Sequence, residues 1–385
     1  MAEFDAVVFG ATGYTGRLVA EHLLKTYGVG GTVKWAMAGR SAAKLGQVAK
    51  EIGAPAGLPL VVADSNDPAS LEAMCKRTNV VITTAGPYQL YGSNLVAACA
   101  QTGADYVDLT GESHWIAQMQ KHDDDAKRTG ARLVFSCGFD SIPFDLGVWY
   151  AEEEAKKKFG AYAPRVRGRI RAMRGGLSGG TMASGQATVA AAQKDHSVIR
   201  VLGNPFALTP GFTGPEQPNG DQTYEDKITG SWVGPFMMAG INTKAVHRTN
   251  YLLRHPWGAD FKYDDMQMLD GPPKAGVAAP GFTMDLANAP KPGEGPTKEE
   301  RDAGFYDIVF IAEMADGRTL RAAVKGDSDP GYGSTSKILA EAGLALAAIP
   351  RHQTPGGCWS PAAAMAHELL AVLPKKAGLT FALES

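Results

Sequence analysis

The stretch AVVFGATGYTG, residues 6–16, decides the fold of this chain. Its first four residues are apolar and predict a short buried strand, and the segment after residue 16 has the apolar spacing of a helix. Between them, Gly10 permits a tight turn, Gly13 lets a pyrophosphate approach the backbone, and Gly16 allows the helix to pack closely on the strand. This order of strand, glycine-rich turn and helix predicts a dinucleotide-binding unit.

The spacing of the turn is GxxGxxG and only approximates the general GxGxxG fingerprint. On spacing alone a plain strand–helix turn is the alternative, but the place of the turn inside a β-α-β unit favours dinucleotide binding. The free N–H groups at the start of the helix would then face phosphate oxygens, with a favourable helix dipole. The residues predicted to hold the cofactor here are Gly10, Thr12, Gly13, Tyr14, Thr15 and Gly16.

Short apolar runs and helical segments alternate along the first 150 residues. Several of the runs are rich in Val and Ile, as expected of strands that are buried on both faces. Repeated alternation implies a parallel sheet with right-handed crossovers. The expected architecture is therefore α/β, with a Rossmann-type doubly wound sheet of strand order 3-2-1-4-5-6. The runs lie at residues 6–9, 35–38, 58–63, 80–84, 106–109 and 133–136.

The pattern changes after residue 150. Residues 165–174 alternate basic and other residues, which predicts an exposed strand with its arginines on one solvated face. An Asp316-Gly317 step between two strand-like segments predicts a hairpin, so we expect a second α/β domain with a mixed or antiparallel sheet. Helical spacing returns near the C-terminus, and we expect these helices to pack back on the first domain. The predicted divisions are 1–150 (cofactor binding), 151–334 (substrate binding or dimerisation) and 335–385 (C-terminal helices).

The end of the second strand, AGRS at residues 38–41, bears on the choice of cofactor. An NAD-preferring site would place Asp or Glu here to bind the ribose hydroxyls, but no acidic residue occurs between Glu21 and Glu51. Arg40 instead offers a planar cation to a 2′-phosphate, and Ser41 offers a second donor at a helix start. A solvated arginine is the alternative for Arg40 taken alone. The missing acid and the present base together favour NADP(H).

Two further strand ends complete the predicted cofactor site. Asp64 follows the third strand, where its carboxylate could accept from the adenine amine or, equally, cap the next turn. Ala85, Gly86 and Pro87 follow the fourth strand. Gly86 has no Cβ where a cofactor would pass, and Pro87 directs the exit of the chain, so we expect the nicotinamide ribose here.

Four side chains near these strand ends are candidates for catalysis. Glu112 and Asp140 follow the fifth and sixth strands, although an acid at such a position, taken singly, is more often a helix cap or a satisfied buried carboxylate than a catalyst. Tyr88 and Tyr91 follow the fourth strand and could donate to a developing enolate, because a tyrosine is a neutral donor at pH 7. Simple packing, with the hydroxyl in water, is the alternative for both tyrosines.

Composition excludes several classes of protein. The 38 Lys and Arg against 40 Asp and Glu leave a net charge of −2, so no electrostatic footprint for nucleic acid is present. The 4 cysteines lack CxxC spacing and the 8 histidines lack HExxH or HxH spacing, so no metal site is predicted. No apolar run approaches the roughly 18 residues of a spanning helix, and the N-terminus lacks the basic region of a signal peptide. We expect a cytoplasmic protein without a transmembrane segment, with peripheral membrane contact left open.

Seven short runs together resemble the saccharopine dehydrogenase-like oxidoreductase family, and most closely its branch of trans-acting enoyl reductases. The resemblance implies a Rossmann domain, a second α/β domain with a mixed sheet, and an NADP(H)-type redox role. The runs are GATGYTG (10–16), AGR (38–40), TTAGPYQLYG (83–92), YVDLTGE (106–112), CGFDSIPFDLG (137–147), GDSDPGY (326–332) and TPGGCWSP (354–361).

The resemblance also implies a substrate class. In the enoyl reductase branch this is an unsaturated fatty acyl or polyketide thioester used in glycolipid synthesis, so the implied partner is a small molecule or an acyl lipid. Two alternatives stay open: a saccharopine-type amino-acid dehydrogenase or imine reductase, and a non-catalytic dinucleotide-binding protein of lipid metabolism. A homodimer is also left open.

Overall fold

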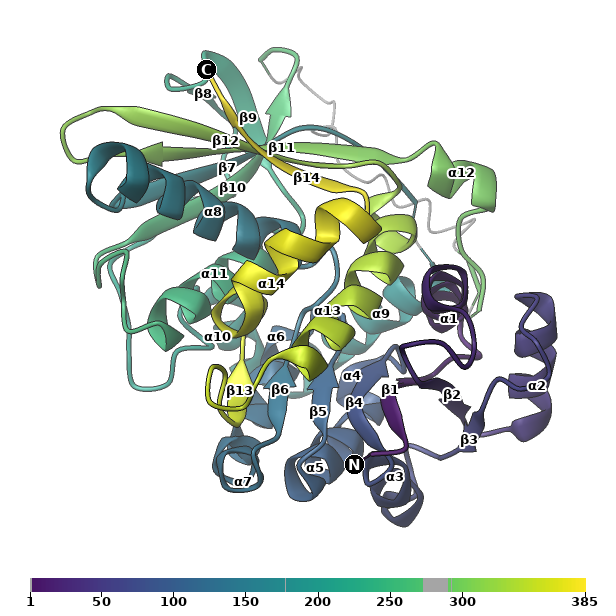
Figure 1. Cartoon of the computed structure of the whole chain (residues 1–385). Helices are drawn as coiled ribbons and strands as arrows, with labels where there is room; N and C mark the ends of the chain where they lie inside the picture. Colours follow the sequence, from purple (N-terminus) through teal and green to yellow (C-terminus); the bar gives the residue numbers. More distant parts are fainter. Residues whose placement is uncertain (1, 177, 273–289, 292) are drawn as a thin grey trace.

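The computed structural model describes residues 2–176, 178–272, 290–291 and 293–385. In this part of the chain the strands form two seven-stranded sheets, with helices α8, α11, α13 and α14 between them (Figure 1). The bounds of these four helices are Ile142–Phe159, Ala239–Leu252, Thr335–Ala348 and Pro361–Lys376. The expected α/β architecture is confirmed.

The first sheet has the strand order β13-β6-β5-β4-β1-β2-β3, and all of its pairings are parallel. The predicted order 3-2-1-4-5-6 is therefore confirmed. The sequence interpretation missed β13, a strand of the C-terminal region that pairs with β6 at the edge of the sheet. The strands are β1 (Phe4–Phe9), β2 (Trp35–Gly39), β3 (Leu60–Val62), β4 (Thr78–Thr83), β5 (Asp105–Val107), β6 (Arg132–Val134) and β13 (Gly357–Trp359).

The crossovers of this sheet are helical. Their caps follow the chemistry of the sequence: the Ser41 hydroxyl accepts from the Lys44 N–H, and the Asp67 carboxylate accepts from the Ala69 N–H. These helices are α1 (Tyr14–Tyr27), α2 (Ala42–Glu51), α3 (Pro68–Cys75), α4 (Tyr88–Tyr91), α5 (Ser93–Thr102), α6 (Ser113–Met119), a 3-10 turn (Gln120–His122) and α7 (Asp123–Thr129).

The second sheet is mixed, with the order β14-β12-β11-β7-β10-β9-β8. The β7–β10 pairing is parallel, while β11 and β12 form the predicted antiparallel hairpin around Asp316-Gly317. Its strands are β7 (Arg165–Arg174), β8 (Tyr224–Asp226), β9 (Ser231–Pro235), β10 (Lys262–Leu269), β11 (Phe305–Glu313), β12 (Thr319–Gly326) and β14 (Leu379–Glu384).

The prediction that the arginines of strand β7 form a solvated face is wrong. Arg169 is fully buried and pairs with Asp226 at 2.7 Å and with Asp264 at 2.8 Å. Arg165, Arg167 and Arg171 also have carboxylate partners, which are contributed by β8, β10, β11 and β14. The alternation of arginines along β7 was predicted correctly. The carboxylates that pair with them come from other strands of the sheet, which the sequence of β7 alone does not reveal.

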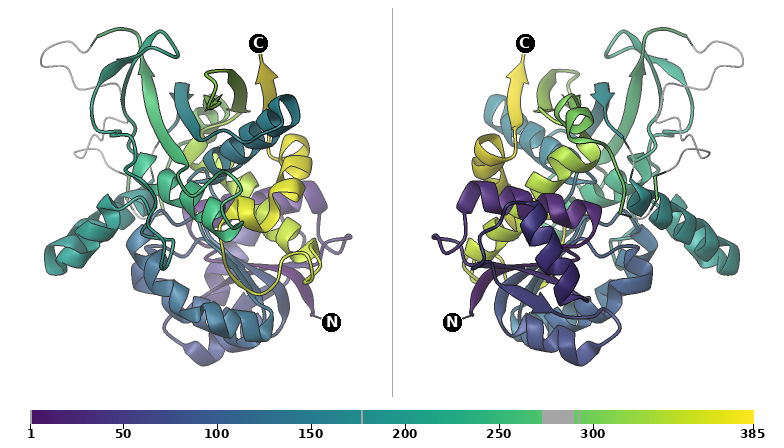
Figure 2. Two further views of the ribbon diagram at one scale, coloured as in Figure 1. Left: turned by 90° about the vertical axis from the view of Figure 1, so that its left-hand side faces the viewer. Right: turned by 90° about the vertical axis from the view of Figure 1, so that its right-hand side faces the viewer.

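Helices α9 (Gly179–Lys194) and α10 (His196–Gly203) project from the side of the molecule (Figure 2). Along the chain, helix α12 (Lys298–Asp302) lies between β10 and β11, and a π turn (Pro330–Ser334) lies between β12 and α13. Helix α13 packs on the first sheet, where a Cβ on Gly343 would come 2.5 Å from Cγ1 of Ile82. The C-terminal segment thus touches both sheets, and the three predicted divisions stay a prediction.

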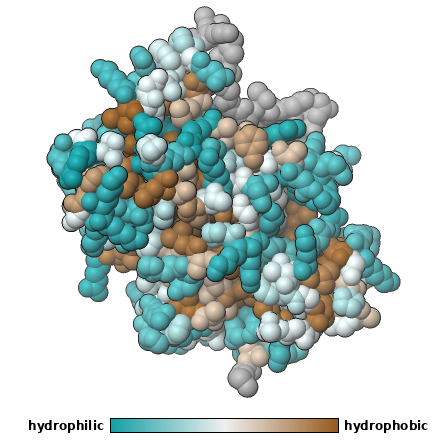
Figure 3. Space-filling model, turned by 45° about the horizontal axis from the view of Figure 1, so that its top comes forward, coloured by the Kyte–Doolittle hydropathy of each residue, from teal (hydrophilic) through white to brown (hydrophobic). Residues whose placement is uncertain are grey.

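Among the residues described, no helix combines the length and apolar character needed to cross a bilayer. On the face shown in Figure 3, hydrophilic side chains are widely spread, with hydrophobic ones in smaller groups between them.

We predict that Gly147→Ala destabilises the fold. Helix α8 packs so closely on the second sheet that a Cβ at Gly147 would overlap the ring of Phe310, which is fully buried. Overpacking of this kind costs about 1–3 kcal/mol, which urea unfolding would measure. Gly46→Ala in α2 is the matched control, because nothing lies within 4 Å of the added Cβ, and it should leave stability unchanged or raise it by about 0.5–1 kcal/mol. Equal midpoints for Gly147→Ala and wild type would contradict this packing.

Candidate functional site

The glycine turn is held against the ends of two neighbouring strands. Gly10 has a φ of +85°, and a Cβ there would also lie 3.0 Å from the Thr84 hydroxyl oxygen. The N–H groups of Gly10 and Ala11 donate to the Ala38 carbonyl at 3.1 and 3.2 Å. A Cβ on Gly16 would overlap the Gly10 carbonyl oxygen. A side chain at Gly10 or Gly16, the first and last glycines of the GxxGxxG turn, would therefore clash with neighbouring atoms.

The start of α1 is suited to an anion. Gly13 is the N-cap residue, no side chain caps the helix, and the first turn contains no acidic residue. Thr12 and Gly13 are exposed, so solvent reaches the backbone at this end. Free N–H groups and the positive end of the helix dipole favour phosphate oxygens. A pyrophosphate fits this turn on local geometry alone.

Arg40 lies at the same edge of the sheet as the turn. The end of β2, which leads into Arg40, lies beside the glycine turn. Arg40 follows Ala38 by two residues, and a Cβ on Gly39 would come 3.8 Å from the Thr12 methyl group. Arg40 is exposed and forms no ion pair with any residue in the described ranges. Its guanidinium is therefore available to an added phosphate, while the Ser41 hydroxyl accepts from the Lys44 N–H at 3.3 Å.

The other two predicted cofactor contacts follow β3 and β4. Asp64 accepts from the Asn66 N–H at 2.9 Å, which is the capping geometry. Gly86 lies beside helix α9, since a Cβ on it would come 3.8 Å from the Ser184 hydroxyl oxygen. Ala85 and Pro87 flank Gly86 at this edge of the first sheet.

The two tyrosines occupy different environments. Tyr88 is buried; its hydroxyl donates to the Thr83 carbonyl at 3.0 Å and accepts from the Leu109 N–H at 3.4 Å. Burial, reinforced by the nearby Asp108, raises the pKa of Tyr88 well above its usual range. Tyr91 is 41% exposed. The Tyr88 hydroxyl therefore already donates to a backbone carbonyl, whereas the Tyr91 side chain lies at the surface.

Glu112 acts as a cap in this structure. Its carboxylate accepts from the N–H groups of Tyr88 and Gln89, at 2.9 and 2.8 Å, at the start of α4. It also accepts from the Ser184 hydroxyl at 3.0 Å, which ties α9 to the first sheet. These three donors satisfy the buried side chain of Glu112 and tie three segments of the chain together.

Asp140 is different, because one of its carboxyl oxygens has no partner. Its Oδ1 is buried and finds no hydrogen bond among the described residues. Burial, together with the nearby Asp265, raises the pKa of Asp140 to about 7. Asp265 lies on β10, in a part of the chain where sequence reasoning named no site residue.

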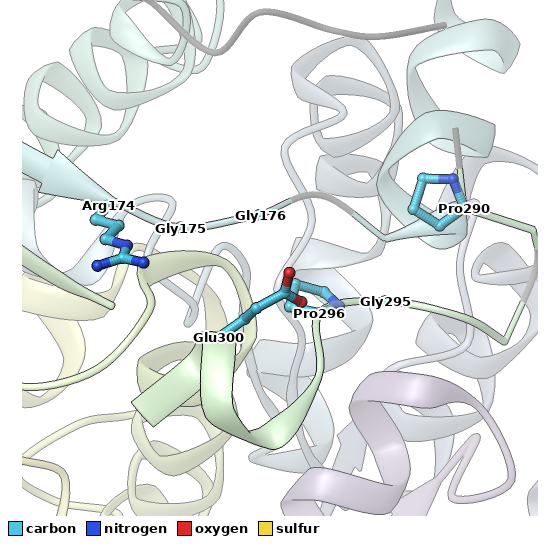
Figure 4. Close-up of a pocket in the computed structure, with 7 residues that line it drawn as sticks. All are labelled: Arg174, Gly175, Gly176, Pro290, Gly295, Pro296 and Glu300. Atoms are coloured by element: carbon cyan, nitrogen blue, oxygen red, sulfur yellow. The ribbon is translucent and has the colours of Figure 1, made fainter. Parts of the chain in front are cut away.

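Residues near Pro296 and Tyr332, which are far from α1 in the sequence, cover the start of α1. The Tyr14 hydroxyl donates to the Pro296 carbonyl and accepts from Arg301 at 2.9 Å. The Tyr14 ring meets that of Tyr332 edge-on, with centroids 5.2 Å apart. Next to this cover is a pocket of about 350 Å³, which Figure 4 shows to be surrounded by separate chain segments. It is lined by Arg174, Gly175, Gly176, Pro290, Gly295, Pro296 and Glu300.

Comparison with known proteins agrees with this geometry. Residues 6–134 match the family model of the saccharopine dehydrogenase NADP binding domain. The trans-acting enoyl reductase of Mycobacterium bovis is 35% identical over 409 residues, covering 97% of this chain and 96% of that protein. The trans-acting enoyl reductase of Mycobacterium leprae is 34% identical over 408 residues, with the same coverage. Saccharopine dehydrogenase (L-Glu forming) from Saccharomyces cerevisiae has the same fold, with a TM-score of 0.55 and 14% identity over 99% of this chain and 100% of its own.

The first sheet, its open helix terminus and the matched domain define an NADP-binding oxidoreductase. The chain belongs to the saccharopine dehydrogenase-like oxidoreductase family, because the similarity to its enoyl reductase members spans nearly the whole length of both proteins. The predicted family and the predicted cofactor, NADP(H), are confirmed.

We predict that Gly16→Ala weakens NADPH binding about 5- to 150-fold, the equivalent of about 1–3 kcal/mol of overpacking. The added Cβ would displace either α1 or the Gly10 carbonyl, so the phosphate-facing N–H groups would move. Fluorescence titration with NADPH measures the change. Gly57→Ala, where nothing lies within 4 Å of the new Cβ, should bind as wild type does. Unchanged affinity in Gly16→Ala would exclude this turn as the binding site.

Proposed function

We propose that this protein reduces the carbon–carbon double bond of an α,β-unsaturated acyl thioester, using NADPH. The observation that carries the proposal is the near full-length similarity to proteins named trans-acting enoyl reductases, in a chain whose first domain binds NADP. Bound NADPH supplies the hydride, which goes to the β-carbon of the substrate. The protein must position the two reactants and supply a proton for the α-carbon.

The proposed cofactor contacts follow the edge of the first sheet. The glycine turn holds the pyrophosphate, Arg40 and Ser41 bind the 2′-phosphate, and Asp64 lies toward the adenine. Residues 85–87 face the nicotinamide ribose. The exposed, unpaired guanidinium at Arg40 supports this assignment, as does the link between its strand and the turn through Ala38.

Asp140 is the proposed proton donor. Among the four candidates it is the acid with a buried, unpartnered oxygen, and with its pKa raised to about 7 it is substantially protonated near neutral pH. The oxygens of Glu112 already accept three hydrogen bonds, and the Tyr88 hydroxyl donates its proton to the Thr83 carbonyl. The surface position of Tyr91 makes it a weaker candidate.

The arginines of β7 favour an acyl substrate over an amino acid. A saccharopine-type substrate carries two or three carboxylates and would need several free cations. Arg165, Arg167, Arg169 and Arg171 each already pair with a carboxylate of the second sheet. We extend the proposal to an acyl-lipid or polyketide-type substrate of glycolipid synthesis, handled in the cytoplasm or at a membrane surface. The same hypothesis includes a homodimer of this chain.

We predict that wild type prefers NADPH and that Arg40→Ala removes this preference. Loss of a charge-assisted contact to the 2′-phosphate should weaken NADPH binding by about 1.5–3 kcal/mol, or roughly 10- to 150-fold. NADH, which lacks that phosphate, is the internal control and should bind both proteins equally. Fluorescence titration with the two nucleotides checks this, and equal wild-type affinities for them would refute the assignment of Arg40.

We predict that Asp140→Asn lowers kcat with a 2-enoyl thioester by about 10²- to 10⁴-fold, the usual contribution of a general acid. NADPH affinity should be retained, because Asp140 is not among the proposed cofactor contacts. Tyr91→Phe is the control and should turn over as wild type does. Oxidation of NADPH, followed by absorbance, is the assay. Bound NADPH that is never oxidised by wild type with any enoyl thioester would favour the non-catalytic alternative.

A further inference from the structure

Arg301 on α12 brings a cation to the uncapped start of α1. Its Nη1 donates to the Tyr14 hydroxyl at 2.9 Å and to the Pro296 carbonyl at 2.7 Å. Tyr14 is the first residue of α1, so its N–H is one of those that face the proposed pyrophosphate. Figure 1 shows the chain that enters α12 running beside the start of α1. A cation from outside the matched NADP-binding domain, which spans residues 6–134, therefore lies against the first helix of that domain.

Protein contacts hold both Tyr14 and Arg301 in place. The Tyr14 hydroxyl donates to the Pro296 carbonyl, and a Cβ on Gly295 would lie 2.6 Å from the Tyr14 ring, so this chain segment packs directly on the ring. The backbone of Arg301 is fixed as well, because its carbonyl accepts from the Asp329 N–H at 2.9 Å. A side chain that is already positioned loses less entropy when it binds a ligand.

The contacts of Arg301 use one of its three guanidinium nitrogens. Among the described residues, Nε and Nη2 have no hydrogen-bond acceptor, and Arg301 forms no ion pair there. Asp302, the next residue of α12, pairs with Lys298 instead. Nε and Nη2 lie along one edge of the planar group, and such an edge matches two oxygens of a phosphate. Arg301 is half-buried, so the free edge is partly shielded from water.

The charges around Tyr14 favour an anion. The Cζ atoms of Arg17 and Arg301 lie 5.9 and 5.8 Å from the centroid of the Tyr14 ring. Both cations are at the positive end of the α1 dipole, and the first turn of α1 holds no acidic residue. Arg17 has two acidic partners, at 3.8 and 4.0 Å. Asp329, the buried acid on this side, already accepts from four backbone N–H groups.

We propose that Arg301 binds the pyrophosphate of NADP(H) through its free edge, and that the Tyr14 hydroxyl positions it for this contact. The inference rests on the proposed place of the pyrophosphate at the glycine turn and is independent of the substrate. The pyrophosphate is then held by the first N–H groups of α1 together with a cation from α12. Since NADPH and NADH both contain a pyrophosphate, Arg301 adds affinity for both, whereas Arg40 distinguishes between them.

The first test is a set of binding titrations with Arg301→Met. NADPH and NADH should both bind about 10- to 100-fold more weakly than to wild type, the loss expected for one charge-assisted contact. The ratio of the two affinities should stay the same, in contrast to Arg40→Ala, which should weaken NADPH alone. Adenosine 2′-phosphate has no pyrophosphate and should bind both proteins equally. Fluorescence measures the two dinucleotides, and calorimetry measures the adenosine phosphate.

Arg318→Met is the matched control. Arg318 is an exposed arginine at the β11–β12 turn, paired with Asp316 at 2.7 Å, so its loss should change no affinity. Unchanged NADH affinity in Arg301→Met overturns the proposal. Weaker binding of adenosine 2′-phosphate to Arg301→Met also overturns it, because the substitution would then disturb the first domain as a whole. Coenzyme A carries a pyrophosphate too, and weakened coenzyme A binding with unchanged NADH binding would assign Arg301 to the substrate instead.

A second test separates the charge of Arg301 from its packing. Arg301→Lys keeps the charge but lacks the two-point edge, so its NADH affinity should lie between those of wild type and Arg301→Met. Rising salt should weaken NADH binding to wild type more steeply than to Arg301→Met, because salt screens contacts between charges. Equal salt dependence in the two proteins would mean that Arg301 acts through packing, and overturns the proposal.

The positioning role of Tyr14 is tested by a double-mutant cycle. Tyr14→Phe should weaken NADH binding in wild type and have no further effect in Arg301→Met, because the hydroxyl acts through Arg301. An equal loss in both backgrounds would refute this role.

Failure of this proposal differs from failure of the proposed cofactor turn. If Gly16→Ala weakens NADPH binding and Arg301→Met does not, the turn holds the pyrophosphate without Arg301. If neither variant changes the affinity, the proposed place of the pyrophosphate is wrong as well. None of these titrations requires turnover of an enoyl thioester.

Discussion

The close approach of helix α1 to the ends of β1 and β4 is the constraint on which the rest of this structure depends. Gly16 has no side chain because the Gly10 carbonyl occupies the space that a Cβ would need, and Gly10 adopts a φ of +85° against Thr84. The contact leaves the first N–H groups of α1 without a side-chain cap. The same turn hydrogen-bonds to Ala38, so it also fixes where Arg40 leaves the second strand. One steric requirement thus arranges both parts of the phosphate-binding edge.

The first domain could be predicted from sequence because its signals are local. Each strand is a short apolar run followed by a turn and a helix, and parallel crossovers leave little freedom in strand order. Strand β13 was missed because Gly357–Trp359 is three residues long and has no local strand signal. Its place is set by pairing with β6, more than 200 residues away in the sequence.

The partners of the second sheet's arginines and the difference between Glu112 and Asp140 were harder to predict for a related reason. The alternation of β7 was visible, but its arginines are neutralised by acids on β8, β10, β11 and β14, so a face that looks solvated in sequence is ion-paired in the fold. Glu112 and Asp140 look alike in sequence, since each follows a strand end. Three donors satisfy the first, whereas an oxygen of the second has no partner among the described residues.

That contrast explains how one sheet edge can carry two buried acids with different tasks. The Glu112 carboxyl group accepts from two backbone N–H groups and a hydroxyl, and these contacts hold α4 and α9 in place. A carboxyl group with a buried, unpartnered oxygen is costly to ionise, and burial raises the pKa of Asp140 to about 7. The first arrangement stabilises the fold, while the second lowers the free energy of unfolding. In the proposed reaction a reductase needs a neutral acid as proton donor, and that need accounts for the unpartnered oxygen of Asp140.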